Sequence, residues 1–245
     1  MIRKMWAIAK KNIRIYYLKG PVLIFGILFP TFLFLAFAFG RNVPSESLVP
    51  GLIGMSLFFT ASATTPAILP IETSTRTLER LLVAPLRLSV LIGGDVVSAF
   101  LFGLLLSAIP IAISFGVLGA SFTQPLQIVA GIGLSALCFA LMGTLLSSPP
   151  TDDPSSIMTL ANLVRLPLIF LSGVFVPVGS MPEWGQRLSR ISPLTYTTEL
   201  LRAGVGQEVE VEPLWCIVAL VAFAVAFWTA SIVLHKKNMS RRLSL

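Results

Sequence analysis

Few side chains in this sequence could do chemistry, and their spacing fits no catalytic or metal site. The one histidine, His235, lies beside Lys236, so neither a catalytic triad nor a zinc site can be built around it. Cys138 and Cys216 sit in apolar runs, without metal-ligand spacing or a disulfide framework. No lysine ends a Gly-x-x-x-x-Gly-Lys-Ser/Thr loop, the motif that cradles nucleotide phosphates. We therefore expect a chain that is not an enzyme and holds no metal.

The most distinctive group of charges is the segment 72–89, ETSTRTLERLLVAPLRLS, which lies between two apolar runs. The run 51–71 carries no charge, and the only charge in the run 90–123 is Asp95. Two membrane helices can be joined by a turn without such a segment. We therefore expect the segment 72–89 to be presented to a partner outside the membrane.

Within this segment the residue spacing favours a short amphipathic helix over a plain connecting loop, which is the alternative. Ser74 or Thr75 is a suitable N-cap. Pro85 disfavours helical geometry at the residue before it and would end the helix. Three leucines fall on one face at helical spacing, namely Leu78, Leu81 and Leu82.

The elements that must position this segment are membrane helices. The 245 residues are 55% hydrophobic and only 12% charged, whereas soluble domains carry roughly 25% charged residues. A helix needs about 20 mostly apolar residues to cross a bilayer. Six stretches qualify, so we expect an all-α membrane protein with six transmembrane helices at 21–39, 51–71, 90–118, 126–147, 162–178 and 213–234.

The distribution of basic residues predicts the orientation of these six spans. Lysine and arginine concentrate before the first span, between the second and third spans, and after the sixth. The positive-inside rule then places both termini and the segment 72–89 in the cytoplasm of a plasma-membrane protein. This pattern also explains the net charge of +7, which is an orientation signal and not a nucleic-acid patch.

Two further regions lie outside the spans. Residues 1–19 repeat apolar side chains at spacings of three and four, with Arg3, Lys10 and Arg14 on another face. This pattern predicts an interfacial helix on the inner leaflet, with its bases facing anionic lipid. The outer loop 179–212 is long and contains a second helical pattern, which suggests short helices that dip into or cap the outer membrane face.

Polar residues inside the spans have two readings. Ser56, Thr60 and Thr64 recur at every fourth residue of the second span, where they would either line a substrate path or let helices pack closely. Asp95 and Arg165 are ionisable residues near the cytoplasmic ends of the third and fifth spans. Such residues are costly in a membrane and are often functional. A contact between them is one reading, although no spacing supports it.

Two separated motifs resemble those of a known family. The run TLERLL at 77–82, followed by APL at 84–86, is similar to the coupling helix of ABC-2-type transporter permeases. The downstream run LSGVFVPVGSMPEWGQRLSRISPLTYTTELLR resembles the C-terminal signature of the same family. The resemblance covers essentially all 245 residues as a single transmembrane domain and is closest to the drug-resistance and nodulation-exporter branch. Many members have Gly-Thr before Leu-Glu, but here Arg76 precedes Thr77 and the Gly is absent, which leaves the start of the helix open.

The resemblance implies a permease subunit of an exporter that moves a lipophilic drug or lipid-like substrate outward by alternating access. Two permease chains, forming a homodimer, would bind two cytoplasmic ATPase subunits, and these would hold the ATP and magnesium. Membrane lipid is a further partner, and no nucleic acid is. The implied coupling residues are Thr77, Leu78, Glu79, Arg80, Leu82 and Pro85. The implied outer-gate residues are Ser172, Gly173, Pro177, Pro182, Pro193, Tyr196 and Arg202.

Two other functions stay open from the sequence. One is export of a lipid-linked polysaccharide or cell-wall glycolipid. It is disfavoured because the sequence has only three tyrosines and its four tryptophans lie mostly near the membrane interfaces. The other is a membrane channel or scaffold that needs no ATPase. That second function predicts that the segment 72–89 can be altered without loss of activity.

Overall fold

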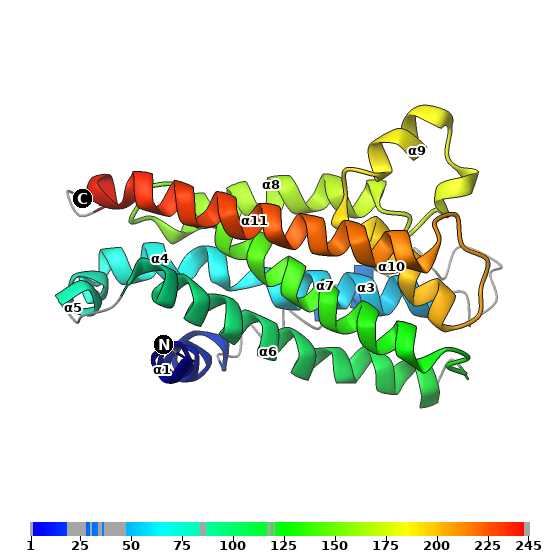
Figure 1. Ribbon diagram of the computed structural model, residues 1–245, viewed down its shortest axis with the longest axis horizontal. Coiled ribbons are helices and arrows are strands. Elements are labelled where there is room, and N and C mark those ends of the chain that lie inside the picture. Colours follow the sequence, from blue (N-terminus) through cyan, green and yellow to red (C-terminus); the bar gives the residue numbers. More distant parts are fainter. Residues whose placement is uncertain are drawn as a thin grey trace.

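The computed structural model describes residues 2–18, 28–29, 31–33, 36, 48–83, 87–116, 119 and 121–242. All regular structure in these residues is helical, and the long helices run side by side in one elongated bundle (Figure 1). In chain order the elements are α1 Ile2–Asn12, η1 Ile13–Tyr17, α3 Val49–Ala63, α4 Thr65–Ser74, α5 Thr77–Val83, α6 Leu88–Gly116, α7 Pro125–Leu146, α8 Pro154–Leu171, η3 Val178–Ser180, α9 Glu183–Ser189, α10 Pro193–Gly204 and α11 Pro213–Arg242.

Proline residues set the starts of four of these helices. Proline lacks an N–H group, but the first residues of a helix have no carbonyl partner for theirs, so proline is favoured there. The four helices that begin at proline are α7 at Pro125, α8 at Pro154, α10 at Pro193 and α11 at Pro213.

Five stretches of the described chain are long and apolar enough to cross a membrane. They are Val49–Ser74, Leu88–Ser114, Pro125–Leu146, Pro154–Leu171 and Pro213–Met239. Each overlaps one of the spans expected from the sequence. The remaining expected span, 21–39, lies outside the described residues apart from a few scattered positions. The all-helical membrane class is therefore confirmed, and the count of six spans stays a prediction.

The second span differs from the single helix expected at 51–71, because it is broken into α3 and α4 at Thr64. Pro66 lies in the first turn of α4 and has no N–H group, so the carbonyl of Ser62, four residues earlier, loses its helical donor. α4 then continues past the expected end of the span to Ser74.

The fifth span also differs from the expected range 162–178, because α8 starts at Pro154 and ends at Leu171. Asp153 caps α8 by accepting hydrogen bonds from the N–H groups of Ser155 and Ser156, at 3.0 and 3.1 Å. These two bonds and one from the Ser156 hydroxyl lower the pKa of the exposed Asp153 carboxyl. Gly173 has a φ of 79°, a left-handed conformation that ends the helical path.

The core of the bundle is built around α3, whose residues are almost all buried. α3 packs against α6, α7 and α10, and Phe58 of α3 meets Phe139 of α7 edge to face with ring centroids 4.9 Å apart. α1 is seen end-on in Figure 1 while the long helices lie across the view, so α1 runs transverse to the bundle. α5 and both ends of the chain lie at one end of the bundle, and α9 lies at the other.

Candidate coupling site and outer region

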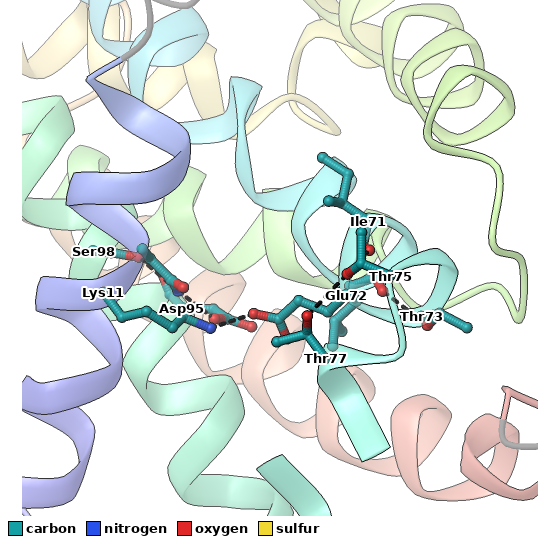
Figure 2. Close-up of polar contacts among 10 residues, drawn as sticks. Lys11, Ile71, Glu72, Thr73, Thr75, Thr77, Asp95 and Ser98 are labelled. Atoms are coloured by element: carbon teal, nitrogen blue, oxygen red, sulfur yellow. Dashed lines mark hydrogen bonds and ion pairs between the residues drawn. The ribbon is translucent and has the colours of Figure 1, made fainter. Parts of the chain in front are cut away.

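The segment between α4 and α6 forms a short helix, α5, after a sharp turn. Arg76 makes this turn with a φ of 54°, in the left-handed region that non-glycine residues seldom adopt. The hydroxyls that the sequence assigned to an N-cap instead end α4, since both Ser74 and Thr75 donate to the carbonyl of Ile71, at 3.0 and 2.7 Å. The Thr75 and Thr77 hydroxyls lie 3.0 Å apart across the turn (Figure 2).

α5 has an inner and an outer side. Leu78 is only 1% exposed and packs in a cluster with Ile8 of α1, Leu69 of α4, and Val90 and Leu91 of α6. Thr77 is half-buried, whereas Glu79 is exposed, as is Arg76 in the preceding turn. Leu78 is therefore an anchor that holds α5 on its own chain, and its expected part in coupling stays a prediction.

The remaining expected coupling residues lie beyond what the structure describes. The backbone at Arg80 and Leu82 is helical, but their side chains are outside the described part of the chain, as is Pro85 altogether. Arg76 and Glu79 are therefore the exposed charged side chains in the described part of α5 and its preceding turn.

Glu72 does not belong to the exposed segment in which the sequence placed it. It lies in α4, is 1% exposed, and forms an ion pair with Lys11 of α1 (Figure 2). Next to this pair, the Asn12 amide donates to the Asp95 carboxylate at 2.6 Å. Ser98 lies 3.4 Å from the same amide. Adjacent residues of the N-terminal helix thus hold the end of α4 and the start of α6, the two helices that flank α5.

A π-helical turn, η1, directs two tyrosines into the same region. A π-turn contains more residues than an α-turn, so Tyr16 and Tyr17 can follow Asn12 on one face of the helix. Both tyrosines are buried, and the Tyr17 hydroxyl lies 3.1 Å from that of Thr65 in α4. Burial raises the pKa of both phenols above the usual value, and the carboxylates of Glu72 and Asp95 add to the effect at Tyr16.

Asp95 and Arg165 do not meet, although the sequence left a contact between them open. Asp95 binds Asn12, whereas Arg165 lies well inside α8 and is 1% exposed. The Arg165 guanidinium donates to the carbonyl of Ser62, the group that Pro66 leaves without a helical donor, and also to the Asn162 side chain at 3.2 Å. Arg165 therefore caps the break in the second span from the fifth span.

The polar stripe of the second span is buried within the bundle. The Thr60 hydroxyl donates to the carbonyl of Ser56 at 2.8 Å, which satisfies it within its own helix. The side-chain oxygens of Ser56 and Thr64 are buried without a hydrogen-bond partner in the described structure. A role for these residues along a substrate path stays a prediction.

The outer region, residues 172–202, is held by a buried ion pair that the sequence reading did not include. Glu199 is fully buried and accepts from Arg202 at 3.2 Å and from the N–H group of Glu210 at 2.7 Å. Arg202 also donates to the carbonyl of Gly173 at 2.9 Å. The i,i+3 spacing of Glu199 and Arg202 on a helical pattern was the available sequence signal.

The other expected residues of the outer region support its short helices. Pro177 precedes η3, Pro182 is the N-cap residue of α9, and Pro193 starts α10. The Tyr196 hydroxyl donates to the carbonyl of Arg190 at 3.1 Å, and the carbonyl of Ser172 accepts from the Thr198 hydroxyl, also at 3.1 Å. α10 is therefore held against the end of α8, and Tyr196 ties it to the loop that precedes it.

No cluster of metal-ligating side chains occurs in the part of the chain that the structure describes. His235 is buried on α11, with its ring nitrogens near the Ser147 hydroxyl at 3.1 Å and the Ser231 carbonyl at 2.8 Å. The long apolar helices of the described residues define a polytopic membrane protein.

Comparison with protein families gives the finer assignment. The chain belongs to the ABC-2 type transporter family, which it matches over residues 3–205. The resemblance carried by the two sequence motifs is confirmed. The chain is thus a permease-type subunit of the plasma membrane with several spans, and its class is that of a transport subunit and not of an enzyme.

Three relatives illustrate the family. The chain is 31% identical over 185 residues to the inner membrane transport permease YadH of Escherichia coli K12, covering 75% of this chain and 71% of that protein. It is 30% identical over 168 residues to nodulation protein J of Bradyrhizobium diazoefficiens, with 68% and 63% covered. A probable multidrug ABC transporter permease of E. coli K12, YbhR, is 27% identical over 172 residues, with 69% and 46% covered.

Proposed function

We propose that this chain is the membrane-spanning subunit of an ABC exporter and that a separate ATPase subunit drives it through α5. Two permease chains, forming a homodimer, would bind two ATPase subunits on the cytoplasmic side, where both chain termini also lie. ATP binding would close the ATPase subunits and move α5, and the spans would then open a path outward. The proposed cargo is a lipophilic or lipid-like molecule, in keeping with the multidrug name of one relative.

The observation that carries this proposal is the construction of α5. A helix of seven residues is too short to be stable alone, and Leu78 holds it against α1, α4 and α6. Its charged outer side, with Arg76 and Glu79, is left exposed at the end of the bundle. A helix that is anchored on one side and charged on the other can receive a partner and pass the motion of that partner to the flanking helices.

Co-purification with the ATPase tests the proposal. The double substitution Glu79→Ala with Leu82→Ala is expected to reduce ATPase recovery and permease-stimulated hydrolysis at least about tenfold, because truncating hot-spot residues of an interface costs about 2 kcal/mol or more. Glu183→Ala, on the exposed surface of α9 at the other end, is the matched control. If the double variant keeps both the ATPase and the hydrolysis, the chain works without this docking helix, and a channel or scaffold becomes the better account.

A further inference from the structure

α1 has one face that packs tightly on the bundle. Met5 and Ile8 lie against Gly93 and Gly94 of α6. A Cβ atom at position 94 would come within 2.6 Å of the Ile8 Cβ and 3.2 Å of the Met5 carbonyl oxygen, so only glycine permits this approach. α1 is therefore seated directly on the backbone of α6.

The opposite face of α1 is basic and aromatic. Arg3 and Lys10 are exposed, as is Arg14 of η1, which continues the helix. Trp6 is 55% exposed, and Ile2 extends the apolar part of this face. The helix runs transverse to the spans, as a helix does when it lies in the plane of a membrane surface (Figure 1). Basic side chains beside a tryptophan are complementary to the phosphate groups of anionic phospholipids at a membrane interface.

The last residues of α1 link this helix to the two helices that flank α5. Lys11 pairs with buried Glu72, and Asn12 binds Asp95, so these two neighbours hold both helices that flank α5. Ile8 also packs in the same cluster as Leu78 of α5. A shift of α1 on the membrane surface would therefore reach α5 through one ion pair (Figure 2), one hydrogen bond and one apolar cluster.

We propose that α1 is an anionic-lipid-dependent clamp: phosphate headgroups of the inner leaflet bind Arg3, Lys10 and Arg14, and the Lys11–Glu72 pair then holds α5 in its docking position. Lys11 is a positioning residue in this scheme and does not contact the lipid. The inference rests on the proposed function, since it describes the regulation of the same coupling helix.

Hydrolysis in vesicles of defined composition tests the clamp. The permease–ATPase complex is reconstituted in phosphatidylcholine with increasing fractions of phosphatidylglycerol, and ATP hydrolysis is measured. Wild-type hydrolysis is expected to rise with the anionic fraction. Lys10→Gln with Arg14→Gln is expected to need a several-fold higher fraction, because each basic residue near an anionic surface contributes about fivefold to the association. Lys236→Gln with Lys237→Gln removes two exposed charges from the same end of the bundle and serves as the control.

A second variant separates the clamp from lipid binding. Lys11→Met with Glu72→Leu replaces the ion pair by an apolar pair, a change that usually preserves folding. This variant is expected to keep its ATPase subunit but to hydrolyse ATP at a rate that no longer responds to phosphatidylglycerol. Inorganic phosphate added to phosphatidylcholine vesicles should not replace the lipid, and activation by free phosphate would overturn the assignment to a membrane surface.

The outcomes distinguish this inference from the proposed function. A complex that hydrolyses ATP at a rate independent of anionic lipid, or that responds equally in the Lys10/Arg14 and Lys236/Lys237 variants, overturns the clamp and leaves the exporter intact. A permease that neither binds an ATPase subunit nor stimulates hydrolysis in any vesicle contradicts the proposed function itself.

Discussion

Replacing Glu199 with alanine is expected to destabilise the protein by about 3–5 kcal/mol, because it leaves the charge of Arg202 without its buried partner. Glu199 is 0% exposed, and its two oxygens bind Arg202 at 3.2 Å and the N–H group of Glu210 at 2.7 Å. Arg202 in turn holds the carbonyl of Gly173 at 2.9 Å. Loss of Glu199 therefore removes the charged partner of Arg202 and the acceptor of the Glu210 N–H group at once.

Thermal unfolding in detergent measures this effect, with an internal control. Glu183 and Arg187 form a second pair in the same region, at 3.7 Å, but both side chains are at least 80% exposed. Exposed pairs contribute about 0–1 kcal/mol, so Glu183→Ala should leave the melting temperature nearly unchanged. A Glu199→Ala protein that melts at the same temperature as Glu183→Ala would show that the buried pair does not hold the outer region.

The second large effect is expected at Arg165. Arg165→Met retains the length of the side chain but removes the donor to the Ser62 carbonyl, and an unsatisfied buried acceptor costs about 1–3 kcal/mol. Pro66→Ala returns an N–H group to the position from which that carbonyl would normally be satisfied. The combination of both substitutions should therefore be more stable than the sum of the single effects predicts.

A double-mutant cycle on Arg165→Met and Pro66→Ala, read by thermal unfolding, quantifies this coupling. We expect an interaction energy of about 0.5–3 kcal/mol, the range for residues that share a hydrogen-bond network. Leu163→Ala, on the exposed side of α8, controls for changes in the helix itself. Strictly additive effects would mean that Arg165 does not compensate for the proline.

The fold class could be predicted from sequence because its signals are local. Apolar length gives the spans, and the charged segment 72–89 stands out between two of them. Charge alone, however, placed Glu72 on the exposed segment. Its burial depends on Lys11, which is 61 positions away, and no local periodicity reports such a partner.

The sequence also does not show whether an amphipathic face points toward its own chain or toward a partner. Helical spacing groups Leu78 with a leucine face, but a face that packs on its own chain and one that binds a partner have the same period. Only the positions of Ile8, Leu69 and Val90 show that Leu78 points inward. The break at Thr64 could be predicted in part, because Pro66 cannot donate to the carbonyl of Ser62. The hydrogen bond that Arg165 donates to this carbonyl from another helix could not be predicted.

Site-specific crosslinking tests the central claim, that α5 is where the ATPase subunit docks. The two native cysteines are buried, so a cysteine introduced at Glu79 is selectively labelled. In the assembled complex, Glu79→Cys should form a permease–ATPase adduct with a short thiol-reactive crosslinker. Glu208→Cys, exposed at the opposite end of the bundle, should form none. No adduct at position 79 in a complex that hydrolyses ATP, or an equal adduct at position 208, would contradict the account.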